Sequence, residues 1–278
     1  MGKRKPPPPL PEPLAGLVDA HTHIDSCGAR TPQAVRELVD RAASVGVDRV
    51  VTVACDLREA RFVVDAARWD ERVYAAVALH PTSAHELADD GVAVELETLA
   101  ADPRCVAIGE TGLDWYWLGK RDDVATPEQQ HTSFEWHVDL AKRLGKPLMI
   151  HNRDADEDIL ADLDRFGAPE TVIFHCFSGD ADMARRCVER GYVLSFSGTV
   201  TFSNAVGLQE AARLVPDGQL LVETDAPFLT PHPYRGTPNE SYAVPYTARF
   251  LAELRGVTAE HIASATTDNA RRVFGIPI

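Results

Sequence analysis

The segment from Asp48 to Leu79, DRVVTVACDLREARFVVDAARWDERVYAAVAL, contains the unit from which the fold is built. Its two ends, Asp48–Val53 and Val73–Leu79, are short valine-rich apolar runs that show no regular alternation with polar residues. Such runs are typical of strands that are covered on both faces, as in a parallel sheet. Between them, Leu57–Trp69 carries apolar residues at helical spacing. The segment therefore predicts a strand, a helix and a second strand parallel to the first.

The same alternation continues along the chain. Further apolar runs occur at Leu17–Asp19, Cys105–Gly109, Pro147–Ile150, Thr171–Phe174, Tyr192–Ser195 and Gln219–Val222. Helical spacing separates them at Pro32–Val45, Leu96–Ala101 (the weakest pattern), Glu128–Leu144, Asp154–Phe166, Asp180–Arg190 and Asn204–Val215, and follows them at Tyr242–Leu254, Ala259–Ala265 and Asp268–Phe274. Eight strands alternating with helices over about 260 residues predict an α/β fold, a (β/α)8 TIM barrel with extra C-terminal helices. A doubly wound open sheet is the alternative, but no glycine-rich dinucleotide or P-loop motif follows a strand.

Composition excludes several classes of protein. The chain has 278 residues, 45% of them hydrophobic, which is too apolar for a disordered chain. No apolar run reaches the roughly 18 residues that span a bilayer, so no membrane segment is expected. Lys and Arg number 28 against 42 Asp and Glu, and the net charge of −14 argues against a nucleic-acid coat protein. The charge does not exclude an enzyme that holds phosphate through metals and a few arginines.

The N-terminal residues and the cysteines suggest a location. The start, MGKRKPPPPLPEP, has positive charge but no apolar region after it, so it is not a secretory signal. We expect residues 1–15 to form a flexible, solvated Pro-rich arm and residues 16–278 to form one domain. The chain has five cysteines, an odd number, and no two of them form a CxxC motif. Neither a disulfide framework nor a Cys-based zinc site is therefore expected, and a reducing, cytoplasmic compartment fits best.

Metal-competent side chains recur where the predicted strands end. They are His21 and His23 after the first strand, His80 after the third, Glu110, His151 and His175 after the fourth to sixth, and Asp225 after the eighth. In a barrel, these strand ends all face one mouth. A single such histidine is most simply a core or surface residue. The set as a whole has no packing role, and a divalent cation is the simplest compensation for buried charge.

The residue types limit the choice of ion. Imidazole and carboxylate ligands suit Zn²⁺, Mn²⁺, Fe²⁺ or Ni²⁺ better than Ca²⁺. His80 is not needed as a ligand, and the other six side chains are more than one tetrahedral ion needs, whereas two ions bridged by a carboxylate would use them all. The residues alone therefore favour a hydrolytic centre with two ions.

The ordered motifs resemble those of the TatD-like metal-dependent DNases, from about Val18 to Gly275. The matching stretches are DAHTHID (Asp19–Asp25), LHP (Leu79–Pro81), IGETGLD (Ile108–Asp114), Gln130 with Phe134, KPLMIHNRDA (Lys146–Ala155), FHCFSG (Phe174–Gly179), SFSGTVT (Ser195–Thr201), LVETDAPFL (Leu221–Leu229) and TTDNA (Thr266–Ala270). The resemblance implies a two-metal 3′–5′ exodeoxyribonuclease with DNA as substrate and no obligate protein partner evident.

The resemblance also implies the role of each ligand. One ion would be held by His21, His23 and Asp225, and a second by His151 and His175, with Glu110 bridging both. Asp225 would also take the proton of the attacking water. The resemblance implies two divalent ions per chain, for which Zn, Mg and Mn are candidates.

The sequence defines the residues that contact the substrate less clearly than it defines the metal ligands. Arg153 follows His151 by two residues and is expected to bind a phosphate, or alternatively to pair with a carboxylate such as Asp154. Arg235 is a second candidate for phosphate binding. His80 would either donate to the scissile phosphate or only line the pocket. The family often has a lysine where this chain has Thr237, which puts substrate affinity in doubt.

Several neighbouring residues have two interpretations. Glu223 would either orient a metal ligand or pair with an arginine. Trp115, Tyr116 and Trp117 would either stack on bases or pack their loop onto the barrel. The ligand set also leaves the substrate open, because the same centre could hydrolyse an ester or amide, as in an aminoacyl-tRNA deacylase. A non-enzymatic barrel with a vestigial site is the third alternative.

Overall fold

The computed structural model describes residues 6–277 and contains one sheet of eight parallel strands. The strands follow one another in sequence order around the sheet: β1 (Leu17–Thr22), β2 (Val47–Val53), β3 (Val73–Ala76), β4 (Cys105–Asp114), β5 (Leu148–Arg153), β6 (Val172–Phe174), β7 (Val193–Phe196) and β8 (Leu220–Val222). Beyond β8, Ala226 forms a parallel bridge with Thr22, so the sheet nearly closes on itself. The predicted (β/α)8 barrel is confirmed, and the order of the strands excludes a doubly wound open sheet.

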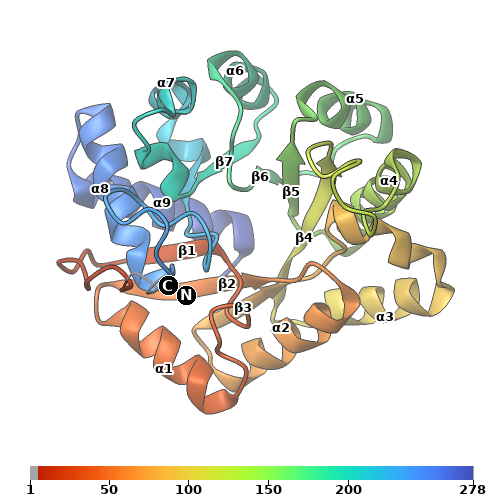
Figure 1. The fold of residues 1–278 in the computed structure, drawn as a ribbon, viewed down its shortest axis with the longest axis horizontal. Coiled ribbons are helices and arrows are strands. Elements are labelled where there is room, and N and C mark those ends of the chain that lie inside the picture. Colours follow the sequence, from red (N-terminus) through yellow and green to blue (C-terminus); the bar gives the residue numbers. More distant parts are fainter. Residues whose placement is uncertain (1–5, 278) are drawn as a thin grey trace.

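Helices surround the strands as a ring, as Figure 1 shows. They are α1 (Pro32–Ala43), α2 (Leu57–Trp69), α3 (Asp90–Ala100), α4 (Pro127–Leu144), α5 (Asp156–Phe166), α6 (Ala181–Glu189), α7 (Val206–Leu214), α8 (Val244–Arg255) and α9 (Ala259–Phe274). Each predicted helix has a counterpart among them. Among the described residues, no helix combines the length and the apolar character that crossing a membrane requires.

Two helices differ from their predicted bounds. The predicted pair Ala259–Ala265 and Asp268–Phe274 is one continuous helix, α9. The Thr266 hydroxyl donates to the Ile262 carbonyl, 2.8 Å away, so it bonds within the helix and does not interrupt it. The weak pattern at Leu96–Ala101 underestimates α3, which begins at Asp90 because the Asp89 side chain caps it by accepting from Gly91 N.

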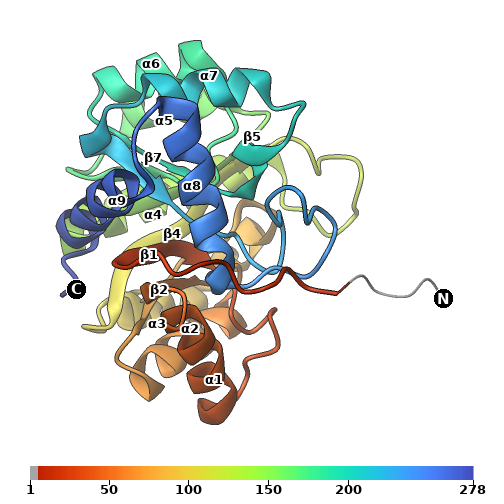
Figure 2. The ribbon, with the colours of Figure 1, turned by 90° about the vertical axis from the view of Figure 1, so that its left-hand side faces the viewer.

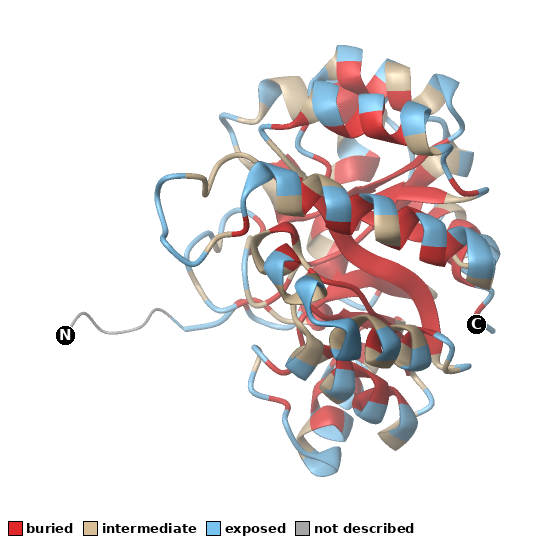
Figure 3. Ribbon diagram, turned by 90° about the vertical axis from the view of Figure 1, so that its right-hand side faces the viewer, coloured by how far each residue is buried: buried red, intermediate tan, exposed pale blue. Residues whose placement is uncertain are grey.

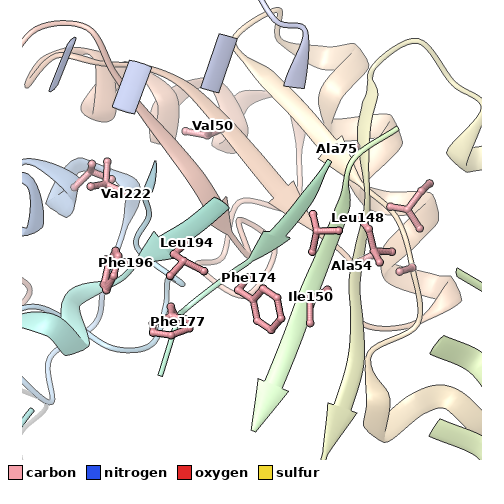
Figure 4. Close-up of a cluster of buried hydrophobic side chains, with 14 of the residues drawn as sticks. Val50, Ala54, Ala75, Leu148, Ile150, Phe174, Phe177, Leu194, Phe196 and Val222 are labelled. Carbon is pink, nitrogen blue, oxygen red and sulfur yellow. The ribbon is translucent and has the colours of Figure 1, made fainter. Parts of the chain in front are cut away.

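The hydrophobic core has two layers, because successive strand residues point alternately toward the helices and into the barrel. Outward-facing side chains such as Val50, Leu148 and Phe196 pack against the helices (Figure 4). Inward-facing residues, one or two from each strand, fill the barrel. Val273 and Phe274 of α9 join this inner group. The strands are accordingly buried along most of their length, with partly exposed residues only at the start of β2 and the carboxyl end of β5, whereas the ring helices bury only their inner faces (Figure 3).

The described part of the Pro-rich arm lies against α8 and the turn before it. Residues 6–13 form no helix or strand, as predicted, and run past one end of α8 in Figure 2. Pro8 and Pro11 are buried, however, and the hydroxyl groups of Tyr242 and Tyr246 donate to the carbonyls of Pro8 and Pro9 at 2.7 and 2.9 Å. The expectation of a solvated arm fails at Pro8 and Pro11, whereas the other residues from 6 to 13 are exposed. Proline carbonyls stay free to accept hydrogen bonds, which lets the arm dock in this way. Residues 1–5 of the predicted arm lie outside the described residues.

Removing one of these hydroxyl groups tests the docking of the arm. Tyr242→Phe is expected to lower the free energy of unfolding by about 1 kcal/mol, because the buried Pro8 carbonyl loses its partner. Urea denaturation at equilibrium measures the change. In a chain that lacks residues 1–13, the same substitution should cost nothing. An equal loss there would show that the Tyr242 hydroxyl stabilises something other than the arm.

Candidate metal centre

The carboxyl ends of the strands surround a pocket of about 620 Å³. Its lining includes seven of the residues that the sequence singles out: His23, His80, Glu110, His151, Arg153, His175 and Asp225. His21 lies beneath this lining and is fully buried. The structure therefore brings all six predicted metal ligands to one end of the barrel. Three lie in β1, β4 and β5, and the other three lie just after β1, β6 and β8.

The seam between β1 and the segment after β8 aligns residues that are about two hundred positions apart. Asp225 N donates to His21 O at 2.9 Å, and His23 N donates to Ala226 O at 2.8 Å. Two residues before His21 on β1, the Asp19 carboxylate accepts from both the amide and the hydroxyl of Thr224, at 2.8 and 2.6 Å. These bonds hold His21, His23 and Asp225 beside one another.

The first donor set has the spacing of ligands around a single ion. His21 Nε2 and His23 Nε2 are 3.2 Å apart. His21 Nε2 is 3.7 Å from both Glu110 Oε1 and Asp225 Oδ1, and His23 Nε2 is 3.5 Å from both. Tetrahedral ligands with bonds of about 2.0–2.2 Å are separated by about 3.3–3.6 Å. The four donor atoms therefore fit one divalent cation.

A second donor set meets the other oxygen of Glu110. His151 Nδ1 and His175 Nε2 are 3.1 and 2.8 Å from Glu110 Oε2. The two oxygens of Glu110 thus face separate groups of donors. A carboxylate in this position can bridge two cations without any modification of the side chain.

Outer partners fix the orientation of three of the four histidines. His151 Nε2 lies 3.0 Å from Asp114 Oδ2, His175 Nδ1 lies 3.3 Å from Glu223 Oε1, and His23 Nδ1 lies 3.1 Å from Val53 O. Each partner accepts a hydrogen bond from the outer N–H of the ring, which leaves the inner nitrogen unprotonated and able to bind a cation. Glu223 thus pairs with His175, a predicted metal ligand, and not with an arginine. Asp114 was not assigned a role, although it follows Glu110 by four residues and so lies on the same face of β4.

The electrostatics of this cluster favour a cation. Burial would raise the pKa of Glu110, but the charge of His175 and bonds to it and His151 hold that pKa well below its usual value. Burial would lower the pKa of His23, yet Asp225 and Glu110 raise it to about 9. Burial and the neighbouring His175 push the pKa of His21 far down. The cluster therefore attracts positive charge, but a proton is favoured on His23 and disfavoured on His21. Metal ions can replace the protons bound at such a site.

The predicted substrate contacts fall in different places. The His80 ring lies edge-on to His151, with centroids 4.3 Å apart, and burial lowers the pKa of His80 to about 3. The Arg153 guanidinium stacks on Tyr116, 3.6 Å from the ring centroid, instead of pairing with Asp154. Arg235 lies over Phe202 in a second pocket of about 800 Å³. The metal pocket therefore holds a neutral His80 and Arg153, but not Arg235.

The aromatic residues of the loop after β4 divide between the two expected roles. Trp115 packs against the core and donates to Asp158 Oδ2 at 2.8 Å. Tyr116 is contacted by the cations of Lys120 and Arg153, and Trp117 lines the metal pocket. Packing therefore accounts for Trp115, whereas Trp117 is placed where it can meet a substrate.

Gly112 allows β4 and β5 to approach closely beside two ligands. Its φ is +143°, and a Cβ at this position would lie 2.1 Å from the His151 carbonyl oxygen. Gly112→Ala is therefore expected to displace His151 and to lower the metal content and the thermal midpoint, by about 1–3 kcal/mol in stability. Gly218→Ala is the control, since nothing lies within 4 Å of its added Cβ. Equal stability and metal content in both variants would contradict this role of Gly112.

Comparison with known proteins gives consistent matches over nearly the whole chain. The sequence model of the family described as TatD related DNase matches residues 18–275. The "uncharacterized metal-dependent hydrolase TatD" of Mycobacterium tuberculosis (strain ATCC 25618 / H37Rv) is 61% identical over 260 residues, which cover 94% of this chain and 98% of that protein. The "3'-5' ssDNA/RNA exonuclease TatD" of Citrobacter rodentium (strain ICC168) is 34% identical, covering 87% of this chain and 92% of that protein.

A solved structure agrees with the sequence matches. The crystal structure of YjjV, a TatD homologue from Escherichia coli K12, superposes with a TM-score of 0.84 at 30% identity, covering 95% of this chain and 100% of that chain. The similarity therefore extends over nearly the whole length of both chains.

Proposed function

This chain belongs to the TatD-related DNase family, and we propose that it is an exonuclease that removes nucleotides from the 3′ end of single-stranded DNA. It is a metal-dependent hydrolase of the TatD type, as the sequence predicted. The observation that carries the proposal is the placement of Glu110, whose two oxygens face separate donor sets. The name of the Citrobacter rodentium relative supports DNA as the substrate. We also propose that residues 16–278 act as one catalytic domain.

The proposed ligand sets follow the measured spacings. His21, His23 and Asp225 would hold one divalent ion, and His151 and His175 would hold another, with Glu110 shared. Ions bound there would supply an activated water and neutralise charge on the phosphodiester. The donor set fits Zn²⁺ or Mn²⁺ and admits Mg²⁺ less readily, because imidazoles predominate.

Asp225 is the proposed proton acceptor of the reaction. Its side chain is 16% exposed, against 5% for Glu110, so it reaches the open pocket. Asp225 Oδ1 faces the two β1 histidines, and the carboxylate is positioned to take a proton from a water in the pocket. His80 is neutral near pH 7 because its pKa lies at about 3, so it can donate a hydrogen bond to a phosphoryl oxygen without adding charge.

The surroundings of the pocket suit a single strand. Trp117 and Arg153 line one side of the metal pocket. Phe228, which is 59% exposed, borders both this pocket and the second pocket that contains Arg235. Exposed aromatic rings and arginines bind unstacked bases and phosphates without sequence preference. We propose that the terminal nucleotide enters the metal pocket and that the preceding nucleotides pass Phe228 toward Arg235.

Product analysis on 5′-labelled single-stranded DNA tests this proposal. With Mg²⁺, Mn²⁺ or Zn²⁺ added, we expect a ladder that shortens from the 3′ end and is abolished by a chelator. Aminoacyl-tRNA is assayed in parallel, because an ester could use the same centre. Intact DNA together with rapid release of the amino acid, from protein with bound metal, would contradict the nuclease and favour the deacylase.

Replacing Arg153 tests its role as a phosphate contact. Arg153→Ala is expected to raise KM for single-stranded DNA by about tenfold or more, because a charge-assisted hydrogen bond is lost, with little change in thermal stability. Arg185→Ala is the control, since Arg185 pairs with Asp182 on α6, away from the pocket lining. A loss of stability with unchanged KM would instead show that Arg153 serves to pack Tyr116.

A further inference from the structure

Cys55 places a thiol among the donors of the candidate metal centre. It lies just beyond the end of β2, a strand that contributes none of the six predicted ligands, and it lines the metal pocket. Its Sγ is 3.4 Å from Glu110 Oε1, the oxygen that also faces His21 and His23. His23, Cys55 and Glu110 each offer a ligand atom within 4.8 Å of the other two.

The backbone fixes Cys55 in this position from both sides. Cys55 N donates to Glu59 Oε2 at 3.0 Å, and Cys55 O accepts from His80 N at 3.0 Å. The first bond ties Cys55 to Glu59 in the first turn of α2, and the second ties it to His80 in the connection that follows β3. These two bonds fix the backbone of Cys55, which keeps its thiol beside the candidate metal centre.

The spacing of the thiol is that of a metal ligand. Cys55 would be the fifth ligand of this ion, and five-coordinate ligands meet at angles of about 90–120°; with bonds of about 2.3 Å to sulfur and 2.0–2.2 Å to oxygen, an intermediate angle separates the two ligand atoms by about 3.5 Å. The observed 3.4 Å between Cys55 Sγ and Glu110 Oε1 is close to this value. The same separation also suits a hydrogen bond from the thiol to Glu110, so the experiment must distinguish the two.

We propose that Cys55 is a thiolate ligand of the ion held by His21, His23, Asp225 and Glu110, and that it makes this position selective for thiophilic cations such as Zn²⁺. The inference rests on the proposed function, because it assumes the same metal centre. Sulfur is a soft donor that favours Zn²⁺ over Mg²⁺ and Mn²⁺. The incoming ion takes the place of the Sγ proton, which passes to solvent.

Cobalt substitution tests the proposal without any substrate. Metal-free protein is titrated with Co²⁺, which reports its binding through visible d–d bands and a thiolate ligand through a charge-transfer band in the near ultraviolet. We expect both bands in the wild type and only the d–d bands in Cys55→Ser. Cys176→Ser is the matched control, because Cys176 lines the same pocket with its Sγ 3.3 Å from Ser197 Oγ. Both bands should remain in that variant.

Competition between ions gives a second measurement. After dialysis against equal Zn²⁺ and Mn²⁺, Cys55→Ser is expected to bind zinc less selectively than the wild type by about tenfold or more. Cobalt d–d bands without a charge-transfer band in the wild type, or a charge-transfer band that persists in Cys55→Ser, would overturn the proposal and leave the centre intact. Absence of all cobalt bands would contradict the metal centre itself, and with it both the proposed function and this ligand.

Discussion

Asp225→Asn is expected to lower the rate of DNA hydrolysis by about 10²–10⁴-fold, because the variant lacks the proposed proton acceptor. Asparagine has the same shape, and like aspartate it tolerates the left-handed backbone of this position, where φ is 53°. The bonds from Asp225 N to His21 O and from His23 N to Ala226 O involve only the backbone and should persist. The loss should therefore appear in kcat, measured as single-turnover cleavage of labelled DNA at saturating protein.

The control for this variant is Asp158→Asn. Asp158 is exposed and accepts a hydrogen bond from Trp115 at the rim, so the same chemical change occurs outside the centre. Its cleavage rate should match the wild type within about twofold, as is usual for a surface substitution. A rate for Asp225→Asn within tenfold of the wild type would show that Asp225 neither accepts the proton nor holds an ion needed for the reaction.

Glu110→Gln is expected to abolish measurable cleavage and to reduce the bound metal from about two ions to one or fewer per chain. The substitution removes the negative charge that both donor sets share, and it leaves His151 and His175 facing a neutral amide. The four histidines then have only Asp225 as an anionic partner among the six predicted ligands. Elemental analysis of dialysed protein measures the metal content, and circular dichroism verifies that the barrel remains folded.

Glu59→Gln separates this effect from a general loss of charge in the pocket. Glu59 lines the same pocket and pairs with Arg58, and a glutamine at this position keeps an oxygen that can accept from Cys55 N. This variant should keep both ions and most of its activity. If Glu110→Gln kept two ions per chain, the bridging role of Glu110 would be refuted even if cleavage were lost.

The strands could be predicted because burial on both faces leaves a simple pattern in the sequence. Each predicted apolar run overlaps one strand of the sheet, and α2 has its predicted bounds. The pattern predicts less well where side-chain bonds decide the outcome. The Thr266 hydroxyl bonds within α9, and Tyr242 binds the carbonyl of Pro8, more than two hundred residues away. Spacing alone cannot show either interaction.

The candidate site was predictable to the extent that it follows the strand ends. Barrel geometry brings His21, His23, Glu110, His151 and Asp225 together, because residues at the carboxyl ends of strands share one mouth. The loops do not obey this rule, so the sequence could not place Arg235 in a separate pocket. The sequence does not mark the thiol of Cys55 as a ligand, because no histidine stands at the end of β2 and Cys55 belongs to no CxxC pair.

The most direct test of the two-ion centre is the anomalous diffraction of crystals soaked in Mn²⁺ or Zn²⁺. The account predicts two peaks, one at each oxygen of Glu110. The first should be ligated by His21, His23 and Asp225, and the second by His151 and His175. A single peak at full occupancy, or two peaks that do not share Glu110, would contradict the bridged centre from which the proposed function is derived.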